Sequence, residues 1–341
     1  MAKQSNPSIS IIIPVFNKAK YLDAVLKSVS EQSFQSFECI LIDDGSTDGS
    51  ASICRAYCEK DDRFIYYHTE NKGVSHARNI GLKSITGEYV TFIDADDRVN
   101  GVYLEELYKN VRQFDADIAL SNYIKVNEQG TEMKYVELPF EEKSYYIDDL
   151  LPMFGDLQTK NGILGYCWGK LVRVKLVTGH YFDENIVLAE DLDFYIRIYP
   201  YITNVSFCEQ AIYYYRQQAE NSSVMVRDKD IDYLTQLKIC LRVKQFLISK
   251  NVYSGNNQEY IDQKIQNYIY FWLLYSNPDD FESRFSNVRN CIMKDDIPFV
   301  YCEGFKKVVL RNVHSGNQET VRMLLLLYGF LRRITKIFRA I

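Results

Sequence analysis

The first 120 residues alternate apolar runs of strand length with segments that carry apolar residues at helical spacing. The apolar runs are rich in β-branched and aromatic residues and lie at 8–16, 37–44, 63–68, 88–94 and 116–123. Alternation of strands and helices is typical of a mostly parallel sheet with helices on both faces. Because the runs are almost continuously apolar, we expect both faces of the sheet to be buried. The pattern therefore predicts an α/β fold.

The pattern changes twice along the rest of the chain. Residues 125–225 are irregular and are interpreted as an α+β completion of the first domain, whereas only helical periodicity is found beyond residue 228. A chain of 341 residues is long enough for two cores, because single cores rarely grow beyond about 250–300 residues. We therefore predict a first domain at 1–225 and an all-helical C-terminal region at 226–341.

The last segment of the chain combines an apolar and a basic helical face. The apolar face would carry Met323, Leu327, Phe330, Ile334, Ile337 and Ile341, and the basic side Arg322, Arg332, Arg333, Lys336 and Arg339. This combination suits a helix that lies on an anionic membrane surface. A helix that packs on the protein, with a solvated basic face, explains the pattern equally well. The apolar run at 323–331 is much shorter than the roughly 20 residues needed to span a bilayer.

Composition restricts the partners and the location. A net charge of −5 argues against a nucleic-acid partner, because nucleic-acid binders usually carry a dominant basic face. The eight cysteines form no C-x-x-C pair and are interpreted as reduced thiols. The N-terminus carries no pattern typical of a signal peptide. We therefore expect a cytoplasmic protein, which could lie peripherally on the inner face of the plasma membrane through its tail.

Polar clusters follow each of the first four predicted strands. They are Pro14-Val15-Phe16-Asn17, Asp43-Asp44-Gly45-Ser46, Glu70-Asn71-Lys72-Gly73 with Arg78-Asn79, and Asp94-Ala95-Asp96-Asp97. Ligands of open parallel sheets bind outside the carboxyl ends of the strands, so these clusters are expected to line one crevice. Taken alone, the second cluster is also an ordinary turn and helix N-cap sequence.

The fourth cluster places three aspartates within four positions, in "VTFIDADD" at 90–97. Like charges this close repel one another, so either water screens them or a cation lies between them, and the neighbouring strand-end clusters favour the cation. Asp94 and Asp96 are therefore predicted to hold a divalent cation, Mn²⁺ or Mg²⁺, that also binds substrate phosphates. Asp97 is predicted to cap a helix that begins near Asn100.

A second acidic site, Glu190-Asp191, begins a helical pattern. Adjacent residues do not share a helical face, so only one of the two is expected to face the crevice. An acidic first turn stabilised by the helix dipole is the alternative interpretation.

Neither a dinucleotide-binding G-x-G-x-x-G nor a P-loop nor a G-x-S-x-G motif is present in the sequence. The phosphates of a ligand would then be neutralised by metal and side chains.

Together these motifs resemble those of the family 2 glycosyltransferases, which have the GT-A fold, a Rossmann-like and mostly parallel sheet flanked by helices. The resemblance is strong over residues 8–120, in "SIIIPVFN", "ILIDDGSTDGS", "NKGVSHARNIGL" and "YVTFIDADD", and looser through "CWGKLVR" and "LAEDLDF" to about residue 225. It does not extend to the helical region after residue 228.

The resemblance implies transfer of a sugar from a nucleotide diphosphate-sugar, with a UDP-sugar favoured, to an acceptor hydroxyl with inversion. The acceptor would be a saccharide or a lipid-linked saccharide in surface polysaccharide or glycoconjugate biosynthesis. The implied donor-binding residues are Pro14, Val15, Phe16, Asn17, Asp43, Asp44, Asn71, Lys72, Gly73, Arg78, Asp94, Ala95 and Asp96, with Asp43 on the base. Asp96 would be the principal metal ligand, and Asp94 would contact the ribose or the metal.

The resemblance also assigns residues to the chemistry of transfer. Asp191 would be the general base that takes the proton of the acceptor hydroxyl. Trp168 and Lys170 resemble an element near the acceptor, although a core tryptophan is an equal alternative. Arg216 would close over the diphosphate, and Glu190 would lie on the acceptor or diphosphate side.

Two other functions fit parts of the pattern. A phosphohydrolase of the haloacid-dehalogenase type also has D-x-D after a strand, but usually early in the domain. A non-catalytic protein could keep the nucleotide-sugar pocket and act in assembly at the membrane, although retention of both acidic sites argues against it.

Overall fold

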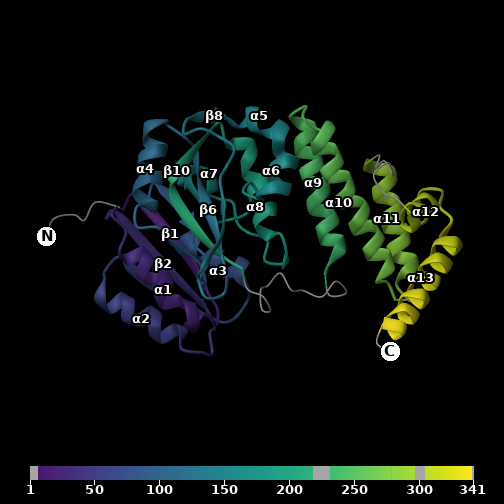
Figure 1. Cartoon of the computed structure of the whole chain (residues 1–341), viewed down its shortest axis with the longest axis horizontal. Helices are drawn as coiled ribbons and strands as arrows, with labels where there is room; N and C mark the ends of the chain where they lie inside the picture. The colour runs from purple at the N-terminus through teal and green to yellow at the C-terminus, as the bar shows by residue number, and fades with distance from the viewer. Residues whose placement is uncertain (1–6, 218–230, 278, 296–303, 340–341) are drawn as a thin grey trace. The chain divides into compact units, whose positions relative to one another are not determined.

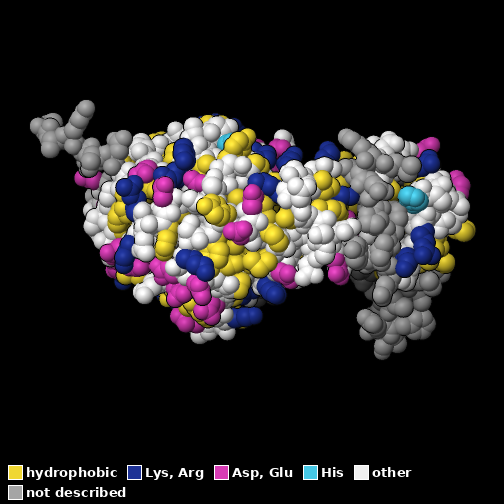
Figure 2. Space-filling model, turned by 90° about the horizontal axis from the view of Figure 1, so that it is seen from above, with side chains coloured by type: hydrophobic (Ala, Val, Ile, Leu, Met, Phe, Trp, Pro, Cys, Tyr) yellow, Lys and Arg dark blue, Asp and Glu magenta, His cyan; other side chains and the backbone are white. Residues whose placement is uncertain are grey.

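The computed structural model describes residues 7–217, 231–277, 279–295 and 304–339 (Figure 1). The chain forms two compact units, Met1–Met225 and Val226–Ile341, whose boundary coincides with the change from the mixed to the helical sequence pattern. On the face of the first unit seen in Figure 2, acidic and basic side chains are interspersed with hydrophobic ones.

The first unit is built on one mixed sheet. Its strands within the described residues are β1 (Ile9–Val15), β2 (Phe37–Asp44), β3 (Phe64–Thr69), β4 (Tyr89–Phe92), β5 (Arg98–Val99), β6 (Ile118–Val126), β7 (Glu132–Val136), β8 (Ser144–Tyr146), β9 (Lys170–Arg173) and β10 (Asn204–Arg216). Their order is β3-β2-β1-β4-β9-β6-β10-β5, with β7 beside β6 and β8 beside β10. Strands β1 to β4 are parallel to their neighbours in this group, and β9 runs antiparallel to β4 and β6. The predicted α/β fold with a mostly parallel sheet and a helical C-terminal region is confirmed.

Helices cover both faces of this sheet (Figure 1). They are α1 (Ala19–Ser30), α2 (Ser50–Lys60), α3 (Val74–Ser84), α4 (Tyr103–Gln113), α5 (Ile147–Leu150), α6 (Phe154–Lys160), α7 (Val174–Val177) and α8 (Glu190–Ile198), with single 3₁₀ turns at Leu151–Met153 and Tyr199–Tyr201. Alternate residues of a strand point to opposite faces. Ile40 and Ile42 pack with Ala77 of α3, whereas Cys39 lies near Cys54 of α2. All eight residues of β2 are buried, which explains the apolar run at residues 39–42.

The helix after the fourth strand does not begin where the sequence suggested. Helix α4 begins at Tyr103, and its N-cap is Val102, which makes no side-chain capping bond. Residues 98 and 99 instead form the short strand β5, which pairs with β10. The prediction that Asp97 caps this helix is therefore wrong.

The second unit contains helices α9 (Tyr233–Ser249), α10 (Gly255–Leu274), α11 (Phe281–Asp295), α12 (Gly304–His314) and α13 (Gln318–Arg339). The carboxylate of Asp232 caps α9 by accepting hydrogen bonds from the N–H groups of Leu234 and Thr235 at 3.1 and 3.2 Å. In the described helices, no segment is long and apolar enough to cross a membrane.

Helix α13 packs through a different face from the one that the sequence suggested for membrane contact. Val321 and Leu325 are buried, while Met323 and Leu327 are 64% and 52% exposed. Hydrophobic and basic side chains lie close together on the face of this unit seen in Figure 2. The side chains of Phe330, Ile334, Ile337 and Ile341 lie outside the described residues, so the predicted tail surface is only partly visible.

Close packing of α3 on β1 depends on Gly81, and this contact can be tested. A Cβ added to Gly81 would lie 2.5 Å from Cγ2 of Ile12, a fully buried strand residue. Overpacking of a core typically costs about 1–3 kcal/mol, more than the roughly 1 kcal/mol by which Ala is favoured over Gly in a helix. We expect Gly81→Ala to lower the free energy of unfolding by about 1–2 kcal/mol in denaturant titration.

Gly49→Ala is the matched control. Its Cβ would meet only the Cβ of Ala19, at an ordinary 3.6 Å. This variant is expected to stay within about 0.5 kcal/mol of the wild type. Equal stability of the two variants would contradict the close contact between α3 and β1.

Candidate functional site

The polar clusters after the first four strands meet in one cleft of about 800 Å³. Of the predicted residues, the cleft is lined by Pro14, Val15, Phe16, Asn17, Asp44, Asn71, Lys72, Gly73, Arg78, Asp94, Ala95, Asp96 and Glu190. Asp43, Trp168, Lys170, Asp191 and Arg216 are not among the lining residues. The carboxyl ends of the strands thus form a single site, as the alternation of strands and helices requires.

The two aspartates at the end of β2 face different surroundings. Asp44 lines the cleft, and its two carboxylate oxygens accept hydrogen bonds from the N–H groups of Lys72 and Gly73 at 2.9 and 2.8 Å. Asp43 is fully buried, and one of its oxygens accepts a 2.7 Å hydrogen bond from the Tyr66 hydroxyl. Asp44, and not Asp43, is therefore the carboxylate that β2 presents to the cleft, which does not support the direct base contact predicted for Asp43.

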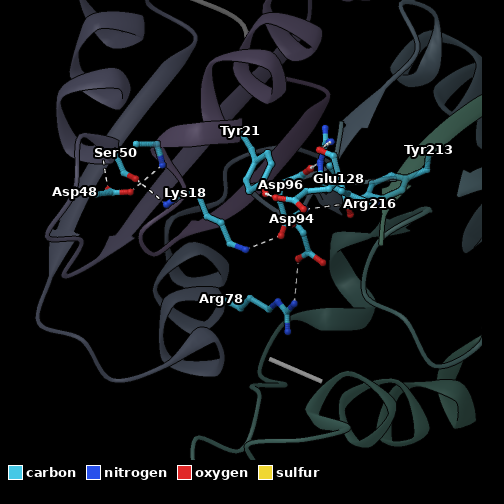
Figure 3. A network of polar contacts seen from close by, with 12 residues as sticks. Lys18, Tyr21, Asp48, Ser50, Arg78, Asp94, Asp96, Glu128, Tyr213 and Arg216 are labelled. Carbon is cyan, nitrogen blue, oxygen red and sulfur yellow. Dashed lines mark hydrogen bonds and ion pairs between the residues drawn. The ribbon is translucent and has the colours of Figure 1, made fainter. Parts of the chain in front are cut away.

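The three aspartates after β4 have three different environments, and two of them, Asp94 and Asp96, are labelled in Figure 3. The N–H of Asp97 donates to the carbonyl of Asp94 at 3.1 Å, which closes a turn. The buried Asp97 carboxylate accepts hydrogen bonds from the Tyr213 hydroxyl and the Arg216 N–H, both at 2.7 Å. Asp97 therefore anchors this turn to the end of β10, while Asp94 and Asp96 face the cleft.

Arg78 joins two acidic elements at the floor of the cleft. Its guanidinium, only 6% exposed, lies 2.8 Å from Glu190 and 3.3 Å from Asp94. Burial raises the pKa of Asp94, and the charge of Asp96 raises it further, while the positive charge of Arg78 lowers it. The guanidinium thus holds α3, the turn after β4 and the start of α8 together.

Lys18 neutralises the other aspartate of the pair. Its ammonium lies 2.6 Å from Oδ2 of Asp96, and both side chains are mostly buried, with exposed fractions of 27% and 19% (Figure 3). The same wall of the cleft contains Lys20, whose ammonium lies 2.5 Å from Glu128, and Tyr21, whose hydroxyl donates to Glu128 at 3.3 Å.

Several lining residues were not predicted from the sequence. Lys18, Lys20 and Tyr21 follow the predicted Asn17 directly, so extending the first cluster into the helix would have found them. Glu128 and Glu184 come from the irregular region, which carries no periodic signal to place them.

Arg216 supports the cleft from behind. Its Nε donates to the carbonyl of Asp96 at 2.7 Å, and one Nη donates to the carbonyls of Asn127 and Glu128 at 3.2 and 2.5 Å. Arg216 therefore connects the turn after β4 to the turn between β6 and β7 (Figure 3). The guanidinium also lies over the ring of Tyr21, 4.9 Å from its centroid. The contact with a diphosphate stays a prediction.

The acidic pair at the start of α8 divides as the helical geometry requires. Glu190 lines the cleft, while Asp191 lies outside its lining. Burial raises the pKa of Asp191 to about 7, and the negative charge of Glu190 adds to this rise. The positive charges of Arg78 and Lys170 lower the pKa and so oppose the rise. Ala189, which precedes the pair, has a left-handed backbone with φ of 62°, an uncommon conformation for a residue with a side chain.

Trp168 and Lys170 belong to the interior. The indole of Trp168 is 3% exposed and stacks on Tyr166 and Tyr213, with ring centroids 4.5 and 4.7 Å apart. Of the two alternatives for Trp168, the structure shows the core residue. Lys170 is fully buried, donates to the carbonyl of Tyr166, and has a pKa lowered to about 7 by burial.

The chemistry of the acidic pair at the floor fits a divalent cation. The described residues contain no group of three or more side chains that could hold a metal ion. Mg²⁺ and Mn²⁺ prefer oxygen ligands, and Mg²⁺ is usually bound through one or two carboxylates plus substrate phosphates and water. Asp94 and Asp96 supply such a pair, and the ammonium of Lys18 shows that Asp96 accepts a cation on the cleft side.

Comparison with known proteins identifies relatives of this chain. Residues 10–171 match the family model described as Glycosyl transferase family 2. Glycosyltransferase GlyG of Streptococcus pneumoniae serotype 4 is 31% identical over 229 residues, which are 66% of this chain and 75% of GlyG. Glycosyltransferase GlyA of the same organism is 36% identical over 61% of this chain, and the match spans only 30% of GlyA. Cholesterol galactosyltransferase of Borreliella burgdorferi is 32% identical over 65% of this chain and 64% of its own length.

A solved structure shares the fold. The structure of S. aureus TarS residues 1–349 in complex with UDP-GlcNAc aligns with a TM-score of 0.65 over 94% of this chain and 91% of that chain. The sequence identity of the two is 19%.

The raised pKa of Asp191 predicts that the stability of the protein depends on pH. A carboxyl with a folded-state pKa near 7, against 3.8 ordinarily, keeps its proton in the folded protein over a range in which the unfolded chain has lost it. Its contribution to stability is therefore present below pH 4 and is lost as the pH rises to about 7. We expect Asp191→Asn to be more stable than the wild type at pH 8, by about 1–2 kcal/mol, and to lose this advantage toward pH 4.

Thermal unfolding between pH 4 and pH 8 measures this difference. Asp62→Asn, at an exposed position, is the control and should leave the difference between variant and wild type independent of pH. A pH-independent difference for Asp191→Asn would show that folding does not raise the pKa of Asp191.

Proposed function

The chain belongs to glycosyltransferase family 2, and on this premise we propose that it transfers a sugar from a nucleotide diphosphate-sugar to an acceptor hydroxyl with inversion. The observation that carries the proposal is the meeting of Asp94 and Asp96 with Arg78 in one cleft. A UDP-sugar is the favoured donor, supported by the UDP-GlcNAc complex of the fold neighbour TarS. The family assignment removes the haloacid-dehalogenase alternative.

The cleft has the parts that a nucleotide diphosphate requires. Phe16 and Val74 are partly exposed apolar residues of the cleft, against which a flat base could pack. Lys72 and Arg78 supply positive charge for phosphates. A divalent ion on Asp96, with Asp94 beside it, would act as a Lewis acid that stabilises the departing nucleotide diphosphate.

Asp191 lies outside the lining of the cleft but directly follows Glu190, which lines it, and we propose Asp191 as the general base. Its pKa of about 7 lies near neutral pH, where a carboxylate is both ionised in part and basic enough to accept the proton of a hydroxyl. Glu190 is held by Arg78 and would keep the floor of the cleft in place. One direct displacement with a single base inverts the anomeric carbon.

The acceptor is proposed to be a saccharide or a lipid-linked saccharide in surface polysaccharide or glycoconjugate biosynthesis. The name of the Borreliella burgdorferi relative, a cholesterol galactosyltransferase, supports a lipid-associated acceptor. The exposed Met323 and Leu327 of α13 support a peripheral position on the inner face of the plasma membrane. The alternative, a non-catalytic nucleotide-sugar-binding assembly protein, predicts donor binding without turnover.

Replacing the proposed base separates catalysis from binding. We expect Asp191→Asn to lower the rate of transfer by at least about 100-fold, the scale of general-base loss, while donor affinity changes little. Turnover of UDP-sugars and donor affinity by calorimetry measure the two effects. Glu190→Gln is the matched variant. Because it removes a partner of Arg78, it should lower the affinity for the donor more than it lowers the rate of sugar transfer from the bound donor. If Asp191→Asn kept full turnover while Glu190→Gln lost it, Glu190 and not Asp191 would be the general base.

The metal assignment has its own test. We expect Asp96→Ala to abolish the Mn²⁺-dependent part of UDP-sugar binding, because it removes the principal oxygen ligand. A thermal-shift screen of nucleotide sugars with Mn²⁺, with Mg²⁺ and with chelator measures this and ranks the donors. Equal stabilisation by the donor with and without chelator, in both wild type and variant, would contradict the role of a metal.

A further inference from the structure

Lys18 forms an ion pair with Asp96, the residue that we propose as the principal metal ligand. Lys18 lies between the end of β1 and the start of α1, and its backbone N–H donates to the Ser50 hydroxyl at 2.9 Å. The backbone is therefore fixed, while the long side chain reaches across the cleft to Oδ2 of Asp96 (Figure 3). With exposed fractions of 27% and 19%, the two charges are only partly screened by water.

The other cations of the cleft have different partners. Arg78 is paired with Glu190 and Asp94, and Lys20 with Glu128. The Nζ of Lys72 lies 3.9 Å from Oε2 of Glu70, whose side chain is 90% exposed. Lys18 is therefore the lining cation in the described cleft that pairs with the Asp96 carboxylate.

A divalent ion and an ammonium compete for the same carboxylate oxygens. If a metal ion entered alone, it would displace Lys18 and leave an ammonium beside a doubly charged cation, which is unfavourable in a partly buried site. If a nucleotide diphosphate entered with the metal, its oxygens would accept the released ammonium. A lysine suits this exchange, because it is a compact charge on a flexible stem.

Resting on the proposed function, we propose that Lys18 is a resident cation of Asp96 that makes metal binding depend on the nucleotide diphosphate. Before the donor binds, the ammonium neutralises Asp96 and weakens its affinity for a divalent ion. Donor binding would draw the ammonium of Lys18 to the diphosphate, which would leave the Asp96 carboxylate able to hold a divalent ion. Metal and nucleotide then strengthen each other's binding by the same factor, as linkage requires.

The test measures Mn²⁺ binding by electron paramagnetic resonance on the full chain, with and without UDP. We expect Lys18→Gln to bind Mn²⁺ alone at least about 5-fold more tightly than the wild type. The factor by which UDP strengthens Mn²⁺ binding should fall by a similar amount, because the variant has no ammonium to release. Lys18→Arg keeps the positive charge and should bind Mn²⁺ alone as weakly as the wild type.

Lys20→Gln is the matched control. It removes one positive charge from the same wall of the cleft, but that charge is paired with Glu128. We expect its affinity for Mn²⁺ alone to change by less than about 2-fold, since only the diffuse charge of the cleft changes. Far-UV circular dichroism and thermal unfolding establish that each variant is folded before binding is measured.

The outcomes separate this inference from the proposed function. If Lys18→Gln binds Mn²⁺ as the wild type does, or no more tightly than Lys20→Gln, while Asp96→Asn abolishes binding, the role of Lys18 is wrong and the metal site stands. If Asp96→Asn leaves Mn²⁺ binding in the presence of UDP intact, both the metal assignment and the role of Lys18 fail.

Discussion

The arrangement of the cleft depends on one buried cation. Arg78 is almost fully buried, and a guanidinium in such a place must be paired. Its partners, Asp94 and Glu190, lie 16 and 112 residues away in the sequence. The ion pairs therefore fix three separate segments against one another. Loss of the cation would leave two carboxylates facing each other at the floor, which is why this contact determines where the other polar groups lie.

The repulsion among the aspartates after β4 is distributed over three different contacts. Asp94 is opposed by Arg78, Asp96 by Lys18, and Asp97 is buried against hydrogen-bond donors of β10. Burial raises the pKa of Asp97 well above its ordinary range, and the charges of Asp96 and Asp94 raise it further. An added cation at the cleft side would lower this repulsion, which is consistent with the metal and diphosphate site proposed for this cluster.

The sequence predicted the strands well because burial on both faces imposes an apolar run, as at residues 39–42 of β2. It also predicted that the strand ends would share one cleft, since the order of strands and helices allows few topologies. The sequence did not show which of Asp43 and Asp44 faces the cleft. Side chains alternate along a strand, so the two residues face opposite sides, but the alternation does not show which side borders the cleft. The error at Asp97 has a related cause: a local cap signal cannot reveal Tyr213 and Arg216, which lie well over 100 residues away. Glu128 was missed for another reason, because it lies in the irregular region of the sequence, which carries no periodic signal to place it.

Lys170 affects the proposed chemistry without lining the cleft. Burial penalises the ionised forms of both Lys170 and Asp191, and it brings both pKa values to about 7. The charge of each raises the stability of the ionised form of the other, so the two titrations are linked. Arg78, the N–H of Leu192 and, to a smaller extent, Lys170 each keep the pKa of Asp191 lower than burial alone would, so part of this carboxylate remains ionised at neutral pH.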